Sequence, residues 1–219
     1  MRVKKEEAVM DNYVITVARG FGSGGKAISV ALAKKLGIPC YEKEILAMAS
    51  EKSGINKALF VERDERLKGS YLVNVMKSVP KDYTVEPSDR KFTHDNNLFN
   101  IQREIIEELA KNQSCIIIGK CADHILKDYP NVLKVFIDAP MADCIASIKE
   151  RMGVSEEEAS RLIVKTDKYR SDYYKYYSGG KHWRNPVNYD VCFNSGFLGR
   201  EKCVDLIIET LENKFNIKF

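Results

Sequence analysis

Short runs of consecutive apolar residues alternate along the chain with longer stretches in which apolar residues recur at helical spacing. The apolar runs occupy residues 13–18, 38–41, 114–119, 133–138 and 189–194. The helical patterns occupy residues 27–36, 97–111, 141–152 and 200–215. Strands that are apolar along their whole length are typical of a parallel sheet with helices on both faces. The pattern therefore predicts a three-layer α/β fold with a five-stranded parallel sheet.

Two segments do not fit this alternation. Residues 44–96 are too long for a simple crossover between strands; they combine a charged helical pattern at 58–68 with a polar run at 80–89, and we interpret them as an inserted helical subdomain. Residues 153–188 contain the capping-box-like sequence Ser155-Glu156-Glu157-Glu158 and continue through basic and tyrosine-rich sequence to Gly179-Gly180. This second segment predicts a helical lid with a glycine hinge.

Composition supports a single folded unit. The chain has 219 residues, of which 44% are hydrophobic and 30% charged, so it can build one sizeable core and is not a disordered composition. We therefore predict one domain over residues 1–219, with its core formed by 13–43, 97–152 and 189–215. The formal charge of +4 is too mild to indicate nucleic acid as a partner.

The six cysteines show no C-x-x-C pair and no histidine at zinc spacing. They predict reduced, mostly buried thiols rather than a metal ribbon or a disulfide framework. Five of the first seven residues are charged, with no apolar segment behind them, and no stretch approaches the length of a membrane span. A cytoplasmic protein without membrane contact is expected.

A glycine-rich sequence follows the first apolar run and precedes the first helical pattern. It reads Gly20-Phe21-Gly22-Ser23-Gly24-Gly25-Lys26 and has the G-x-x-x-x-G-K spacing of a phosphate-binding P-loop. Glycines let successive backbone N–H groups turn inward on an anion, and a lysine at the helix start lies beside the phosphates. Ala27 stands where a P-loop usually has the Ser or Thr that helps to hold Mg²⁺, so the metal ligands are unknown from the sequence.

The predicted lid is rich in positive charge. On helical spacing, Arg161, Lys165 and Lys168 fall near one face, Arg170 follows two residues on, and Asp167 could orient a substrate group or pair with a neighbouring cation. Cations around the oxygens that gain charge are what phosphoryl transfer requires of a protein. A solvated amphipathic helix explains any single one of these residues equally well.

Aromatic residues follow these cations in the predicted lid. They are Tyr173, Tyr174, Tyr176 and Tyr177, with His182 and Trp183 close behind. They could stack on a base, but the commoner explanation is that they belong to the core. No recognised nucleic-acid-binding motif accompanies them.

Further polar residues come at the ends of predicted strands, where parallel α/β sheets collect ligands. Gly119, Lys120 and Asp123 follow one apolar run, and Asp138 closes the next. Either aspartate could bind substrate or a metal-bound water, although a helix N-cap is at least as good an explanation for Asp138.

Taken with the P-loop, three further elements make the chain similar to the cytidylate-kinase-like family of P-loop kinases over residues 13–215. They are Gly119-Lys120-x-x-Asp123, Asp167-Lys168-Tyr169-Arg170, and Tyr189-Asp190-Val191-Cys192-Phe193-Asn194-Ser195. Two of them depart from bacterial cytidylate kinase, which has Gly-Arg-Asp where this chain has Gly119-Lys120-Cys121, and Asp-Arg-x-Arg in the lid. Both departures exchange an arginine for a lysine.

The resemblance implies a nucleoside monophosphate kinase fold of the P-loop NTPase type. ATP with Mg²⁺ would bind at residues Gly20, Gly22, Ser23, Gly24, Gly25, Lys26 and Ala27, and the acceptor under the inserted subdomain of residues 44–96. The lid positions Asp167 and Arg170 match residues that touch the acceptor nucleotide in cytidylate kinase.

We therefore expect an ATP-dependent kinase for a small phosphorylated acceptor, with a nucleoside monophosphate such as CMP or dCMP as the leading candidate. Lys26, Lys120, Lys168 and Arg170 would act on the transferring group, and Asp123, Asp167, Arg170, Arg161 and Lys165 would bind the acceptor. Two alternatives remain open at this point: a nucleotide-binding sensor that has lost catalysis, and a kinase for a non-nucleotide metabolite. The oligomeric state is not indicated.

Overall fold

The computed structural model of the chain describes residues 12–54 and 95–219. Five parallel strands form one sheet in the order β2-β3-β1-β4-β5. They are β1 (Val14–Arg19), β2 (Cys40–Tyr41), β3 (Cys115–Ile118), β4 (Val132–Asp138) and β5 (Val191–Asn194). Each lies within one of the apolar runs or overlaps it closely, so the predicted five-stranded parallel sheet is confirmed.

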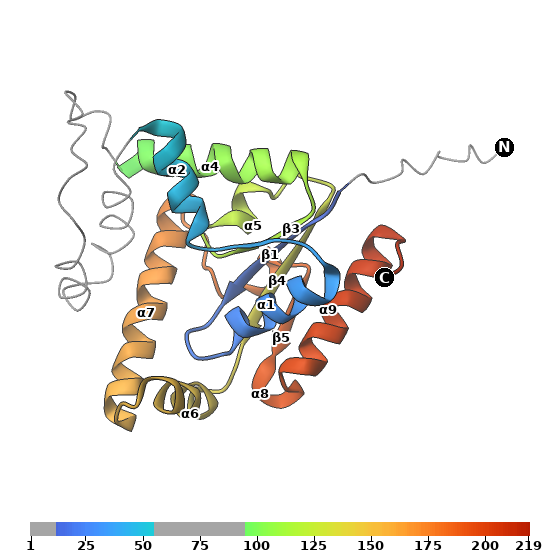
Figure 1. The fold of residues 1–219 in the computed structure, drawn as a ribbon. Helices are drawn as coiled ribbons and strands as arrows, with labels where there is room; N and C mark the ends of the chain where they lie inside the picture. Colours follow the sequence, from blue (N-terminus) through green and yellow to red (C-terminus); the bar gives the residue numbers. More distant parts are fainter. Residues whose placement is uncertain (1–11, 55–94) are drawn as a thin grey trace.

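Helices cover both faces of this sheet (Figure 1). The helices are α1 (Gly25–Leu36), α2 (Glu44–Ser53), α4 (Asp95–Asn112), α5 (Ala122–Ile125), α6 (Met141–Met152), α7 (Glu156–Tyr177), α8 (Ser195–Leu198) and α9 (Arg200–Phe215), with a short 3₁₀ turn η3 at Pro186–Asn188. The predicted helices at 27–36, 97–111, 141–152 and 200–215 correspond to α1, α4, α6 and α9.

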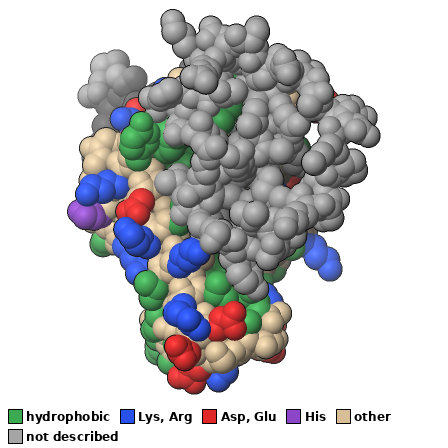
Figure 2. Space-filling model, turned by 90° about the vertical axis from the view of Figure 1, so that its left-hand side faces the viewer, with side chains coloured by type: hydrophobic (Ala, Val, Ile, Leu, Met, Phe, Trp, Pro, Cys, Tyr) green, Lys and Arg blue, Asp and Glu red, His purple; other side chains and the backbone are tan. Residues whose placement is uncertain are grey.

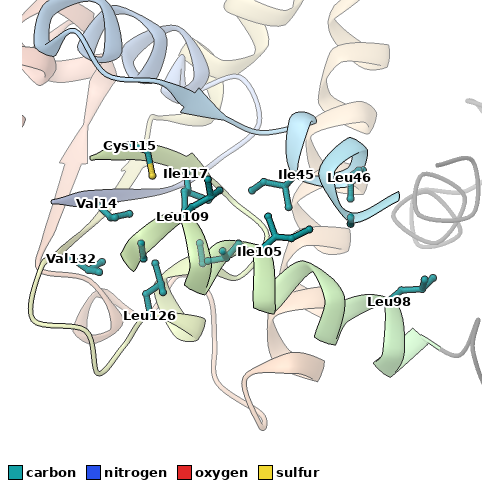
Figure 3. Close-up of a cluster of buried hydrophobic side chains, with 14 residues drawn as sticks. Val14, Ile45, Leu46, Leu98, Ile105, Leu109, Cys115, Ile117, Leu126 and Val132 are labelled. Carbon is teal, nitrogen blue, oxygen red and sulfur yellow. The ribbon is translucent and has the colours of Figure 1, made fainter. Parts of the chain in front are cut away.

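Side chains of β1 and β3 alternate between two separate cores, as the period of two in a strand requires. Val14, Cys115 and Ile117 point to the core beneath α2 and α4, which Figure 3 shows in close-up. Ile15 and Ile116 point to the opposite core, beneath α1 and α9. The two strands are fully buried because both faces are covered, which explains why their sequences show no polar alternation.

The parallel register brings the carboxyl ends of three strands together. Val14 pairs with Cys115 on one side and with Val132 on the other, and β1 lies between β3 and β4 over residues 14–17. The loops that follow these three strands therefore meet at one edge of the sheet. The P-loop follows β1 and lies at the centre of that edge.

The predicted lid region contains one continuous helix, α7, which lies against α6 (Figure 1). Its N-cap is Ser155, whose hydroxyl accepts a hydrogen bond from the Glu158 amide at 3.1 Å, as the capping-box sequence predicts. The helix ends before Gly179 and Gly180, both of which have positive φ. Of the predicted inserted subdomain, α2 covers the beginning, whereas the segments 58–68 and 80–89 lie outside the described residues.

The cysteines agree with the sequence expectation. All six are free thiols, and four of them are buried: Cys115, Cys121, Cys144 and Cys203. In the described parts of the chain, no helix combines the length and the apolar character needed to cross a bilayer.

Candidate phosphate-binding site

The P-loop connects the end of β1 to the start of α1. Gly22 and Gly24 have φ of +94° and +77°, a conformation that side chains disfavour. A Cβ on Gly22 would also lie 2.8 Å from the backbone oxygen of Cys144, so glycine is required there for space as well. Gly24 is the N-cap of α1 and has no side chain to cap the helix. The positive end of α1 is therefore open toward an anion.

The hydroxyls of two serines donate hydrogen bonds to backbone carbonyls of the loop. The Ser23 hydroxyl donates to the Gly20 carbonyl at 2.9 Å and is buried. The Ser195 hydroxyl, at the start of α8, donates to the Ser23 carbonyl at 2.6 Å. These bonds fix the loop backbone from the sheet side and leave its other side facing a cavity.

That cavity has a volume of about 490 Å³. It is lined by the P-loop and by side chains from five further elements or turns: Arg19, Gly20, Phe21, Gly22, Gly24, Gly25, Lys26, Ala27, Glu42, Ser147, Glu150, Arg151, Arg170 and Arg200. This lining carries five Lys or Arg residues and two Glu residues, so its formal charge is strongly positive. A small anion with several charges, such as a polyphosphate, matches both the size and the charge of the cavity.

Glu42 lies between two of these cations. Its carboxylate accepts from Lys26 Nζ at 2.5 Å and from Arg19 Nη2 at 2.7 Å. Burial acts to raise the pKa of Glu42, but the hydrogen bond from Lys26 and the charge of Arg19 outweigh burial and lower it overall. In this structure the Glu42 carboxylate therefore forms an ion pair with Lys26, the P-loop lysine that a phosphate would otherwise contact.

Helix α7 contacts the P-loop through the buried acid Asp167 and the mostly buried cation Arg170. Asp167 Oδ1 accepts from the backbone N of Phe21 at 2.8 Å, and Arg170 Nη1 donates to the backbone oxygen of Arg19 at 2.8 Å. Arg184 Nη2 donates to Asp167 Oδ2 at 2.9 Å. Loop residues on either side of Gly20 are thus bonded to α7.

Burial perturbs the pKa of both α7 groups. Burial, followed by the positive charge of Arg19, lowers the pKa of the Arg170 guanidinium to about 9. Burial also raises the pKa of Asp167, although the Phe21 amide and the charges of Arg170 and Arg184 act in the opposite direction. Positive groups crowded in this way gain stability when an anion joins them, and perturbed groups of this kind cluster at functional sites.

A family model now identifies the chain: the model of the cytidylate kinase-like family matches residues 14–196. The chain belongs to this family. The match begins with β1, includes the P-loop and α7, and ends in α8. The resemblance inferred from the sequence motifs is therefore confirmed.

Solved structures agree with this assignment. An uncharacterized protein from Eubacterium ventriosum is 27% identical and superimposes with a TM-score of 0.67, over 92% of this chain and 99% of that one. Shikimate kinase from Bacteroides thetaiotaomicron is 16% identical with a TM-score of 0.51, over 91% and 98% of the two chains. A gluconokinase from Sinorhizobium meliloti is 13% identical with a TM-score of 0.50, over 93% and 96%. The last two show a shared P-loop kinase fold, and no curated protein sequence matches the chain.

Of the residues predicted for this cytidylate kinase-like site, the structure brings Lys26, Arg170 and the P-loop residues other than Ser23 to the cavity lining, whereas Ser23 and Asp167 are buried and do not line it. Arg161, Lys165 and Lys168 lie on the exposed face of α7. Lys168 pairs with Asp172 at 2.9 Å, and Arg161 lies 4.0 Å from Glu157. These three residues are not part of the cavity lining, and their proposed contacts with substrate stay predictions.

Lys120 lies in the turn after β3 and Asp123 in the short helix α5 that follows it, and both are outside the cavity lining. Gly119, Lys120 and Cys121 all have φ between +58° and +70°, a left-handed run that is unfavourable for the two residues with side chains. Asp123 is buried behind this turn and accepts from the Tyr174 hydroxyl at 2.7 Å. Burial raises the pKa of Asp123 to about 6. The described contacts give Asp123 a partner within the protein rather than a substrate.

The aromatic residues after Arg170 pack largely into the protein. Tyr174 and Trp183 are buried in one apolar cluster, and Tyr177 stacks on Phe99 with the ring centroids 3.8 Å apart. Tyr176 is 63% exposed. The face that carries α7 shows basic and acidic side chains intermixed, without a continuous basic patch in the described part (Figure 2). Core packing, the commoner of the two explanations offered by the sequence, is thus confirmed for Tyr174 and Trp183.

The cavity offers few ligands for Mg²⁺. Ala27 supplies no hydroxyl, and among the described residues no group of three or more His, Cys, Asp or Glu side chains could enclose a metal. Asp138 is engaged by Arg184 at 3.2 Å, and the N-cap of α6 is Pro140 rather than Asp138. The carboxylate nearest the P-loop lysine belongs to Glu42. Mg²⁺ binds oxygen ligands and keeps several waters, so one carboxylate together with substrate phosphates fits it.

Sequence reasoning missed six charged residues of this site: Arg19, Glu42, Glu150, Arg151, Arg184 and Arg200. Glu42 carried a usable signal, because it directly follows a predicted strand at the ligand-binding edge of the sheet. Arg19 carried a similar one, since it is the charged end of an otherwise apolar strand. The other four come from a helix end, a loop and a helix start, and no local pattern distinguishes them from surface charges.

Proposed function

We propose that this protein transfers the γ-phosphate of ATP to a small phosphorylated acceptor of the nucleoside monophosphate class, with CMP and dCMP as the first acceptors to test. The observation that carries the proposal is the convergence of the uncapped start of α1, Lys26 and the mostly buried Arg170 on one cationic cavity. Membership of the cytidylate kinase-like family supports phosphotransfer, and the acceptor rests on the sequence resemblance.

The residues present suit phosphoryl transfer, which needs little covalent chemistry from the protein. The backbone N–H groups at the start of α1 would bind the donor phosphates, and Lys26 would neutralise them. Arg170 would stabilise charge on the transferring group from the side of α7. Glu42 would hold Mg²⁺ through its carboxylate, and the metal would neutralise charge on the phosphate oxygens.

Glu42 would exchange partners when substrate binds. In the ligand-free protein it neutralises Lys26 and Arg19. Phosphate oxygens would compete for both cations, since charge-assisted hydrogen bonds to phosphate are strong. The carboxylate would then be released toward a metal ion beside those phosphates.

Calorimetry with ATP and a coupled assay for ADP production test the proposal. The acceptor panel contains CMP, dCMP, UMP and unrelated phosphorylated and unphosphorylated metabolites, each with Mg-ATP. Lys26→Met is expected to weaken ATP binding and to lower kcat/KM by about 10²-fold, because it removes the cation that contacts the donor phosphates. Lys34→Met removes the same charge from the exposed last turn of the same helix and serves as the matched control.

Four outcomes are informative. Turnover of one nucleoside monophosphate supports the proposal. Tight ATP binding without turnover of any acceptor would contradict it and favour the nucleotide sensor, whereas turnover of a non-nucleotide metabolite would favour a kinase for such a metabolite. Absence of heat with ATP and GTP, with and without magnesium, would remove all three.

A further inference from the structure

The buried face of α7 carries polar groups at helical spacing. Ile163, Asp167 and Tyr174 are buried and follow one another at intervals of four and seven residues, which places them on one side of the helix. Arg170 lies beside them and is mostly buried. A buried aspartate needs strong partners, so the groups that surround Asp167 indicate what it does.

We propose that Asp167 is a positioning residue that holds the P-loop in its anion-binding shape and fixes it to α7, rather than a ligand of the acceptor. This inference rests on the proposed function, because it assumes that the P-loop binds a nucleotide. It goes beyond the family resemblance, which assigns this position to the acceptor nucleotide.

The first argument is the bond to the loop itself. Asp167 Oδ1 accepts from the Phe21 amide at 2.8 Å, which is a charge-assisted hydrogen bond from a carboxylate to the backbone. Phe21 directly precedes Gly22, whose φ of +94° is the first left-handed conformation in the loop. Fixing the Phe21 amide therefore fixes where the loop turns.

The second argument concerns the other partners of Asp167. Its second oxygen accepts from Arg184 at 2.9 Å, and Arg184 also lies 3.2 Å from Asp138. Asp138 in turn borders the loop, since a Cβ on Gly20 would collide with its carboxylate. The loop is thus held on one side by Asp167 and bordered on the other by Asp138, with Arg184 joining the two acids.

The third argument concerns the availability of the carboxylate. Asp167 is 7% exposed, and both of its oxygens already accept hydrogen bonds from Phe21, Arg170 or Arg184. A direct bond to an acceptor would require one of these contacts to break.

Cation–π contacts also hold Phe21 in place, because the guanidinium groups of Arg151 and Arg170 lie 5.4 and 5.6 Å from the centre of the Phe21 ring.

Helix α7 is also bonded to the neighbouring turn. Tyr174 donates to Asp123 at 2.7 Å, immediately behind the left-handed turn that contains Lys120. The same helix face therefore contacts the loop after β1 and the turn after β3. This arrangement makes α7 a brace between the P-loop and the segment that follows β3.

Amide hydrogen exchange tests the brace without any nucleotide. In protein labelled with ¹⁵N-phenylalanine, the Phe21 amide is expected to exchange slowly, and Asp167→Ala is expected to speed its exchange by about tenfold or more, because the accepting oxygen is lost. Asp167→Asn keeps an accepting oxygen but loses the charge, so it should give an intermediate rate. Asp205→Ala, which breaks an exposed pair with Lys35, is the matched control. An unchanged Phe21 rate in Asp167→Ala would overturn the proposal.

Ligand binding then separates the two roles of Asp167. A positioning role predicts that Asp167→Ala raises the Kd for Mg-ATP by about tenfold while the KM for the acceptor changes less than threefold, with partial rescue in Asp167→Asn. An acceptor ligand predicts the opposite split, with the KM for the acceptor raised and the Kd for ATP unchanged. If the wild-type protein bound no ATP, the proposed function would fail, and the exchange experiment would still decide whether Asp167 holds the loop. Should Asp167→Ala fail to fold, the same two readouts are taken from Asp167→Asn.

Discussion

The two faces of α7 carry similar charges but lie in different surroundings. On the buried face, Asp167 and Arg170 bond to the P-loop backbone. On the exposed face, Arg161 and Lys168 make surface ion pairs with acids of their own helix. Surface pairs of this kind contribute little energy, because solvent screens them and long side chains lose entropy. Position on the helix, and not charge, decides which basic residues can serve the site.

Comparing the two faces of α7 also distinguishes a lid, which opens and closes over a cavity, from a brace, which is bonded to the loops beneath it. A helix that opens and closes over a cavity needs few bonds to the residues beneath it. The buried face of α7 instead contacts loop residues through Asp167 and Arg170, and the turn after β3 through Tyr174. Any closure on binding would therefore have to come from other parts of the molecule, or break these bonds first.

The largest difference in kcat/KM is expected between variants of two arginines that lie on opposite faces of α7. Arg170→Ala removes a cation from the cavity and leaves the Arg19 carbonyl without its guanidinium partner, so kcat/KM should fall by about 10²–10³-fold. Arg161→Ala should change kcat/KM by less than about twofold, because its side chain is 71% exposed and lies outside the cavity lining. Steady-state kinetics with the identified acceptor measures both. Equal losses in the two variants would contradict the distinction between the faces.

A smaller effect is expected on stability, through Asp123, which the buried face contacts. Burial raises the pKa of Asp123 from 3.8 to about 6, so the folded state favours the protonated form. The resulting stabilisation is fully present below about pH 4 and is lost as the pH rises through about 6, which amounts to about 2–3 kcal/mol. Asp123→Asn cannot ionise, so it should gain stability relative to wild type over this range. Urea unfolding at several pH values measures the difference.

The exposed face provides the control for that experiment. Asp172→Asn breaks the pair with Lys168, in which both side chains are more than half exposed. Its free energy of unfolding should change by less than about 1 kcal/mol. A constant difference between wild type and Asp123→Asn from pH 4 to pH 7 would show that Asp123 does not titrate in this range.

How much of this could be read from the sequence depends on the kind of signal. The strands and the P-loop were predictable, because continuous apolar runs and a fixed glycine spacing are local patterns. The orientation of α7 was not, since grouping residues by charge placed Arg161, Lys165 and Lys168 near one face, with Arg170 two residues on, and did not show which face is buried. The apolar residues of the helix supply a better guide: Ala159 and Ile163 define the buried stripe, and Asp167 and Tyr174 continue it.

Contacts between residues far apart in the chain could not be predicted from the sequence, and the reason is physical. Glu42 and Lys26 meet because β2 and β1 end at the same edge of the sheet with β3 between them. That strand order is set by the tertiary structure and has no local signature. The same holds for Arg184, which reaches Asp138 and Asp167 from a loop after α7.

A substitution of Glu42 tests whether Lys26 and Arg19 need a counter-charge when no nucleotide is bound. Glu42→Gln keeps the shape of the side chain but removes the charge that neutralises Lys26 and Arg19. ATP without metal should then bind up to about tenfold more tightly, because no carboxylate competes for the two cations. The enhancement of binding by Mg²⁺ should shrink if Glu42 holds the metal. Calorimetry with and without Mg²⁺ separates the two effects, and an unchanged Mg²⁺ dependence would place the metal elsewhere.

The smallest effect is expected at the start of α1. Ala27→Thr restores the hydroxyl that P-loops usually offer to Mg²⁺, at an exposed position that can accept a larger side chain. If Glu42 already holds the metal, the added hydroxyl should raise Mg²⁺ affinity and kcat by less than about threefold, since it replaces one water among several ligands. Metal titrations at fixed ATP measure this change in wild type and variant. A gain of about tenfold or more would mean that the wild-type site lacks an effective ligand, and it would shift the proposal from a competent kinase toward an impaired one.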